Sequence, residues 1–115
     1  MDAREYTPLA LRTASKDGQF VNAGLGIAGE AGEVADIVKK VTFHNKPLDR
    51  GHAIAELGDL CWYINSMIDV LDTSWSEVFE TNIRKLEARY PDGCFNTDRA
   101  NNRDVKAELM AMLRK

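Results

Sequence analysis

The chain has 115 residues and a formal net charge of −3. This length suits one domain, residues 1–115, and the acidic balance argues against a nucleic-acid-binding surface, which usually carries a basic excess. No apolar segment resembles a secretory signal or is long enough to span a bilayer. We therefore expect a soluble, cytoplasmic protein whose partners include neither a membrane nor a nucleic acid polymer. A nucleotide substrate stays open, because a bound metal ion can supply positive charge.

Helical signals run through nearly the whole chain. Thr7 followed by Pro8 predicts the N-cap and first position of a short helix. Asp49 predicts the N-cap of a long helix, and Ser74 with Glu77 predicts a capping box. Helices are expected at about 7–14, 19–41, 49–71, 74–90 and 104–113, with a polar stretch at 96–103. No segment alternates with a period of two residues, so the sequence predicts an all-α, four-helix-bundle-like fold with short terminal helices.

Two acidic pairs lie in stretches that otherwise consist of small and apolar residues: Glu30 with Glu33, and Glu56 with Asp59. The spacing within each pair puts both side chains on one face of a helix. Solvated surface acids are the simpler interpretation of one such pair, but two pairs beside apolar residues favour a site. Close carboxylates repel one another unless a cation neutralises them. Because oxygen ligands suit hard cations, the four residues predict a Mg²⁺ site, with Mn²⁺ as an alternative ion.

Both acidic pairs continue along helix rows that border the apolar side. The rows are Gly26, Glu30, Glu33 and Ile37 on the second helix, and His52, Glu56, Asp59 and Tyr63 on the third. The neighbouring row of the third helix is strongly apolar, so the carboxylates are expected beside the core. Cys61, in the same apolar helix, is expected to be a buried free thiol.

Glycines crowd the second helix around the first acidic pair, at positions 24, 26, 29 and 32. Each costs about 1 kcal/mol relative to Ala in a helix interior. This density predicts the close approach of another backbone or of a ligand. The glycines also match G-x-G-x-x-G, but a dinucleotide-binding motif is rejected because no strand precedes them and no βαβ pattern surrounds them.

The fourth helix carries a polar and basic row made of Asn82, Lys85 and Arg89. A Lys and an Arg one turn apart can bind phosphate oxygens, Arg through its planar fork and Lys as a point charge. The alternative is a solvated basic face that is balanced by neighbouring glutamates. The acidic cluster elsewhere in the chain favours the phosphate-binding interpretation.

The acidic pairs, the glycines around them and the basic row together resemble the motifs of a known family. The segment from Leu25 to Val34, followed by Glu56-x-x-Asp59, resembles the E-x-x-E…E-x-x-D signature of the all-α nucleoside triphosphate pyrophosphohydrolases, in its MazG-like form. The downstream run from Asn82 to Gly93 is similar to the corresponding segment of that branch. The resemblance covers about residues 22–95, and it departs locally at Cys94, where the family often runs directly from Gly to Phe.

The resemblance implies Mg²⁺-dependent hydrolysis of a nucleoside or deoxynucleoside triphosphate to the monophosphate and pyrophosphate, for nucleotide pool control or house-cleaning. It also implies a MazG-type helical fold that assembles as a homodimer or homotetramer. The metal would be held by Glu30, Glu33, Glu56 and Asp59, and the phosphates by Asn82, Lys85, Arg89 and Tyr90. One glutamate of the first pair would orient or deprotonate the attacking water.

Two alternatives remain. One is a phosphoribosyl-ATP pyrophosphohydrolase on the same scaffold, against which the MazG-like glycine-rich motif argues. The other is a non-catalytic helical module that binds nucleotides. The preferred base depends on the shape of the pocket, for which Phe20, Asn22, Trp62 and Tyr63 are candidates.

Overall fold

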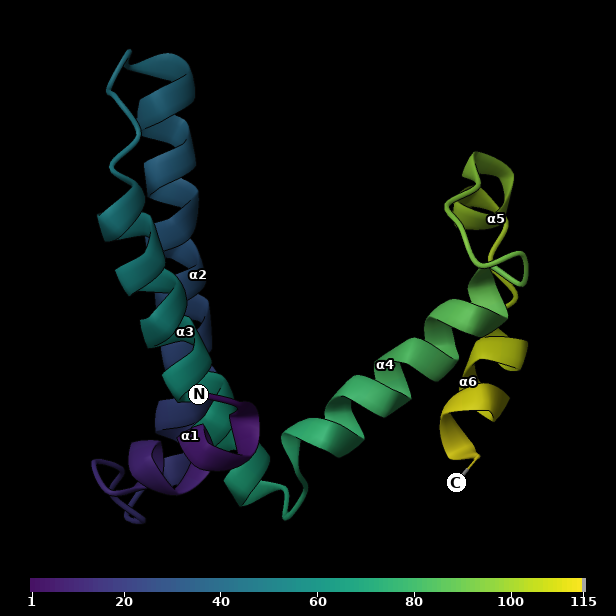
Figure 1. The fold of residues 1–115 in the computed structure, drawn as a ribbon, viewed down its shortest axis with the longest axis horizontal. Helices are drawn as coiled ribbons and strands as arrows, with labels where there is room; N and C mark the ends of the chain where they lie inside the picture. Colours follow the sequence, from purple (N-terminus) through teal and green to yellow (C-terminus); the bar gives the residue numbers. More distant parts are fainter. Residues whose placement is uncertain (115) are drawn as a thin grey trace. The chain divides into compact units, whose positions relative to one another are not determined.

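The computed structural model describes residues 1–114, and within them the chain is helical and has no strand. The helices are α1 (Ala3–Leu11), α2 (Gln19–Phe43), α3 (Arg50–Val70), α4 (Trp75–Arg89), α5 (Thr97–Asn101) and α6 (Val105–Leu113), as Figure 1 shows. The predicted all-α fold is therefore confirmed. No helix within residues 1–114 is both long enough and apolar enough to cross a membrane.

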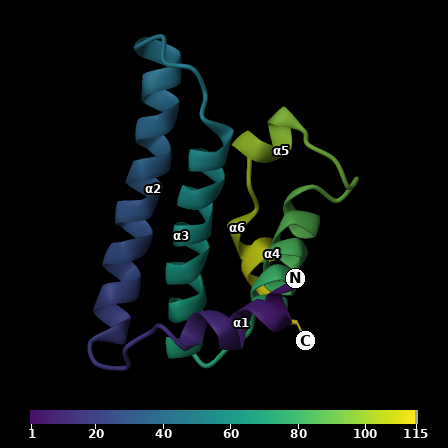
Figure 2. The same cartoon turned by 60° about the vertical axis from the view of Figure 1, so that its left-hand side comes forward.

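The helices form two compact units, of which the first is Met1–Thr73 and the second begins at Ser74. In the first unit, α2 and α3 form an antiparallel hairpin and lie side by side along their length (Figures 1 and 2). Helix α1 packs against α3 near the end of the hairpin where α2 begins. In the second unit, α4 packs against α6.

Helix α1 begins earlier than the sequence analysis predicted. The carboxylate of Asp2 accepts a hydrogen bond from the Glu5 backbone N–H (2.9 Å), and the Glu5 carboxylate accepts one from the Asp2 N–H (3.0 Å). This capping box satisfies two donors that the first turn leaves free. The predicted start at Thr7 and Pro8 is wrong: Pro8 lies inside the helix, and the Thr7 hydroxyl donates to the Ala3 carbonyl (2.8 Å).

The other predicted helix starts are largely confirmed. Asp49 caps α3 by accepting a hydrogen bond from the His52 N–H (3.0 Å), and Ser74 caps α4 by accepting one from the Glu77 N–H (3.1 Å). Helix α5 was not predicted, because the stretch 96–103 is polar. Asn96 starts this helix by accepting a hydrogen bond from a backbone N–H (3.0 Å) in its first turn.

A buried polar network ties the start of α2 to the end of α3. The side-chain amide of Gln19 donates to Ser66 Oγ (3.1 Å) and to the Asp69 carboxylate (3.0 Å). Asp69 also pairs with Lys16, just before α2. The Lys16 hydrogen bond first, and then that of Gln19, lower the pKa of Asp69 below its ordinary value. The network fixes how the two helices meet at this end of the hairpin.

Many large apolar side chains of the first unit are exposed. Leu25 on α2 is 70% exposed, and Leu57 on α3 is 50% exposed. Cys61 is a free thiol, as predicted, but it is exposed, so the prediction that it is buried is wrong. It lies one turn beyond Leu57 on α3, and that part of the apolar row is therefore not covered by other residues of the first unit.

Helix α6 is attached to α4 through Glu108, which is only 1% exposed. The Glu108 carboxylate accepts hydrogen bonds from the guanidinium groups of Arg103 (2.8 Å) and Arg89 (2.5 Å). These bonds, with that of Arg103 the larger cause, lower the pKa of Glu108 to about 2. A buried carboxylate is tolerated here because two cations pair with it.

The Glu108 contact predicts an acid-sensitive second unit. A carboxyl group whose pKa falls from 4.5 to about 2 on folding stabilises the fold fully above pH 4.5, and this stabilisation is lost as the pH falls towards 2. We expect Glu108→Gln to remove that part of the pH dependence, whereas Glu87→Gln, at an exposed position of α4, should retain it. Urea unfolding curves on either side of this pH window measure the effect. An equal pH dependence in Glu108→Gln and the unmodified chain would contradict it.

Candidate metal centre

Three acidic side chains meet where α2 and α3 face each other. Glu30 comes from α2, and Glu56 and Asp59 come from α3. One carboxylate oxygen from each residue lies within 4.8 Å of the others. Glu30 and Glu56 are half-buried and Asp59 is exposed, so the cluster borders the helix interface and opens to solvent. The structure thus brings together one acid of the first predicted pair and both acids of the second.

A glycine allows the two helices to approach beside this triad. A Cβ atom built on Gly26 would lie 2.1 Å from Cδ1 of Tyr63, so the Tyr63 ring occupies the space that any other residue would need. The sequence analysis predicted the close approach of another backbone or of a ligand, whereas the neighbour found at Gly26 is a side-chain ring. At Gly29 and Gly32 an added Cβ would meet nothing within 4 Å among the described residues. Of these three glycines, only Gly26 lies at a position where a larger residue would meet a side chain of α3.

Glu30 carries the strongest electrostatic signal of the triad. Its Oε2 atom is buried and has no hydrogen-bond donor among the described residues. Burial first, then a hydrogen bond shared with Glu56, and then the charges of Asp59, Glu56 and Glu33 raise the pKa of Glu30. A proton shared between Glu30 and Glu56 relieves this repulsion, and a cation would do so more completely.

The triad fits a divalent cation with oxygen ligands. Its donors are all carboxylates, which suit Mg²⁺ or Mn²⁺ better than the softer ions that bind thiols and imidazoles. The Oε2 atom of Glu30 gives independent support for a bound cation. It is buried and receives no hydrogen bond from the described residues, and such an acceptor is costly in free energy unless a cation meets it. Three protein ligands leave coordination positions for water and for substrate oxygens.

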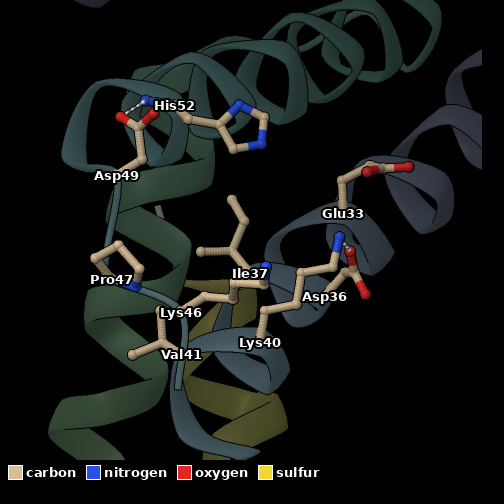
Figure 3. Close-up of a pocket in the computed structure, with 9 residues that line it drawn as sticks. All are labelled: Glu33, Asp36, Ile37, Lys40, Val41, Lys46, Pro47, Asp49 and His52. Carbon is tan, nitrogen blue, oxygen red and sulfur yellow. Dashed lines mark hydrogen bonds and ion pairs between the residues drawn. The ribbon is translucent and has the colours of Figure 1, made fainter. Parts of the chain in front are cut away.

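Glu33 lies outside the triad, although its spacing from Glu30 predicts a shared helix face. It is exposed and lines a separate pocket beside the hairpin loop, which Figure 3 shows. His52 lines that pocket too, and its Nε2 atom lies 3.8 Å from Oε1 of Glu56. The role of Glu33 as a metal ligand stays a prediction.

A second pocket, of about 420 Å³, adjoins the triad. It is lined by Glu30, Asp59, Trp62 and Tyr63. The indole N–H of Trp62 donates to Thr13 Oγ1 (2.9 Å), and the Trp62 and Tyr63 rings meet edge to face with centroids 5.0 Å apart. The lining of the pocket therefore combines two carboxylates with two aromatic rings that pack against each other.

The sequence analysis missed Tyr6, which comes from α1. Its pKa is raised, first by burial and then by the charges of Cys61 and Asp59. The Tyr6 hydroxyl is therefore close enough to the triad to feel the charge of Asp59. No motif could have indicated this, because only the packing of α1 against α3 brings Tyr6 there.

The predicted phosphate-binding residues all lie in the second unit. Asn82 is exposed on α4, Lys85 is half-buried, and Tyr90 ends the helix. The Arg89 guanidinium is already bonded to Glu108 (2.5 Å) and lies 5.9 Å from the centroid of the Tyr90 ring. Substrate binding by Asn82, Lys85, Arg89 and Tyr90 stays a prediction.

Comparison with known proteins supplies independent evidence. Residues 22–94 match the model of the MazG nucleotide pyrophosphohydrolase domain. A protein of Mycobacterium phage L5, described as "Gene 37 protein", is 37% identical over 73 residues, which are 60% of this chain and 64% of that protein. The chain thus covers less than two thirds of the length of this relative. No solved structure matches the chain.

The matched range contains the whole triad, the glycine that lets α2 and α3 approach, and the aromatic pocket beside it. It also covers more than half of the chain. The chain therefore belongs to the MazG nucleotide pyrophosphohydrolase family.

Proposed function

We propose that this protein hydrolyses a nucleoside or deoxynucleoside triphosphate to the monophosphate and pyrophosphate with Mg²⁺ as cofactor. The observation that carries the proposal is the triad of Glu30, Glu56 and Asp59 with an aromatic pocket beside it. Carboxylates that hold a divalent cation suit a polyphosphate, and aromatic rings suit the flat face of a base. A nucleotide has both parts.

In this proposal the residues have separate roles. The triad holds the ion, and the buried Oε2 atom of Glu30 gains the partner that it lacks. The bound ion supplies Lewis acidity to phosphate oxygens and to water. Glu33 is proposed as a further ligand of the ion, and one glutamate of the pair Glu30 and Glu33 is proposed to orient or deprotonate the attacking water. Trp62 and Tyr63 offer surfaces for the base.

We propose further that the two compact units together form a single domain. In support of this, the family match extends from residue 22 to residue 94 and so includes parts of both. The protein is also proposed to be a homodimer or homotetramer. The exposed stripe of Ile54, Leu57 and Cys61 on α3 carries no charge, and a second copy of the chain could cover it.

The test is pyrophosphate release from a panel of ribo- and deoxyribonucleoside triphosphates, with Mg²⁺ or with a chelator. We expect release from at least one substrate in the presence of Mg²⁺ and none with the chelator. The panel also identifies the preferred base and sugar. Silence across the panel from a folded protein would contradict the proposal and favour phosphoribosyl-ATP as substrate or a non-catalytic binding role.

A further inference from the structure

Trp62, which lines the aromatic pocket beside the triad, is held by a residue outside the part of the chain that matches the family. Its indole N–H donates to Thr13 Oγ1 (2.9 Å), a contact that spans 49 positions of the sequence. Thr13 lies just after the end of α1, whereas the family match begins at residue 22. One wall of the pocket is therefore tied to a segment that the family match does not include.

The Thr13 hydroxyl is the middle member of a chain of hydrogen bonds. The indole N–H of Trp62 can only donate, so the hydroxyl must accept from it. The hydroxyl in turn donates to the Ala10 carbonyl (2.9 Å), which also accepts from the Thr13 backbone N–H (3.2 Å). Successive bonds in such a chain polarise one another. The chain thus connects the Trp62 ring to the last turn of α1, where carbonyl groups lack partners within the helix.

Helix α1 is itself attached to α3, so it can serve as a fixed support for the ring. The side-chain amide of Asn65, a residue that is only 1% exposed, donates to the Thr7 carbonyl in the middle of α1 (3.4 Å). Asn65 follows Trp62 by three positions and therefore lies on the same side of α3. The middle of α1 and the turn that follows it are thus both bonded to this side of α3.

The orientation of the Trp62 ring depends on two contacts. One is the edge-to-face contact with Tyr63, in which the ring planes meet at 86°. Packing of this kind restrains the ring but does not by itself select one orientation, because the outer torsion of a Trp side chain has a broad energy profile. The other contact is the directional bond to Thr13, which fixes where the indole N–H points. Trp62 is only half-buried, so a ring without this bond could turn towards solvent.

We propose that Thr13 is a positioning residue of the nucleotide pocket, whose hydroxyl holds the Trp62 indole in the orientation that stacks on the base. The proposal rests on the proposed function, and it adds a residue that acts through Trp62 without touching the substrate. Stacking between two aromatic planes depends on their relative orientation. Loss of the hydroxyl should therefore weaken binding of the nucleotide and leave the chemistry at the triad intact.

The kinetic test compares Thr13→Val, which removes the hydroxyl at nearly the same side-chain volume, with Thr13→Ser, which retains it. With the nucleotide that the substrate panel shows to be preferred, Thr13→Val should raise KM about three- to tenfold, the usual value of one hydrogen bond, and change kcat little. Thr13→Ser should restore most of the lost affinity. Thr42→Val makes the same change at an exposed position of α2 and should behave like the unmodified chain.

The fluorescence of Trp62 tests its orientation without requiring turnover. The chain has two tryptophans, so Trp75→Phe leaves Trp62 as the single emitter. In this background Thr13→Val should lower the fluorescence anisotropy of Trp62 and increase its quenching by acrylamide, because the ring gains freedom and exposure. Thr13→Ser and Thr42→Val should change neither quantity. Thermal unfolding of each variant confirms that the fold is retained.

The two measurements keep failure of this proposal apart from failure of the proposed function. Unchanged anisotropy and quenching in Thr13→Val would overturn the proposal whether or not the protein turns over a nucleotide. An unchanged KM, or a loss in Thr13→Ser as large as that in Thr13→Val, would overturn it as well. Silence of the unmodified chain on the substrate panel would instead contradict the proposed function, and with it the role of Trp62 in stacking on a base.

Discussion

Replacing Glu56 by Gln should reduce Mg²⁺-dependent pyrophosphate release by ~10²-fold or more while the helices stay folded. Glu56 supplies one of the three grouped carboxylates, and an amide cannot provide the negative charge that holds a divalent cation. The substitution also removes repulsion, because charge on Glu56 is one cause of the raised pKa of Glu30. Without metal, the variant should therefore be at least as stable as the unmodified chain.

Two measurements on the same sample separate these effects. Pyrophosphate release reports the loss of activity, and thermal unfolding with and without Mg²⁺ reports binding of the ion, which stabilises only the folded state. The stabilisation by Mg²⁺ should disappear in Glu56→Gln. Glu87→Gln makes the same chemical change at an exposed position of α4 and should retain both activity and stabilisation. Normal turnover in Glu56→Gln would remove the triad from the proposed function.

Gly26→Ala should destabilise the protein, although Ala is the better helix former by about 1 kcal/mol. The new Cβ would lie 2.1 Å from Cδ1 and 2.5 Å from Cγ of Tyr63. The ring cannot turn aside freely, because it packs edge to face against Trp62. Forcing the helices apart is expected to cost ~1–3 kcal/mol of unfolding free energy, measured by urea denaturation.

Gly32→Ala is the matched control for this prediction. It lies on the same helix, and its added Cβ would meet nothing within 4 Å among the described residues. It should therefore leave the stability unchanged or raise it by up to ~1 kcal/mol. In a double-mutant cycle with Tyr63→Ala, the Gly26→Ala substitution should cost less than it does in the unmodified chain, since the ring that the new Cβ meets is absent. If Gly26→Ala were as stable as Gly32→Ala, the proposed close packing would be wrong.

The sequence by itself determined the local features of this protein. Regular helical spacing put Glu56 and Asp59 on one face of a helix. Asp49 and Ser74 marked helix starts, because the first turn leaves backbone N–H groups free and these side chains can accept hydrogen bonds from them. The same local rules failed at Thr7 and Pro8, where the capping box begun by Asp2 provides the stronger start signal. They also favoured metal chemistry, because two pairs of close carboxylates repel one another unless a cation neutralises them.

Only the tertiary structure decided which of these residues meet. Glu30 and Glu33 are equivalent in spacing, but the contact between α2 and α3 brings only Glu30 into the triad. The bond between Arg89 and Glu108 joins residues on different helices, and no local pattern predicts it. Likewise Cys61 lies in an apolar sequence yet stays exposed. Helical periodicity fixes the face on which a side chain lies, whereas the partner of that face depends on how the helices pack.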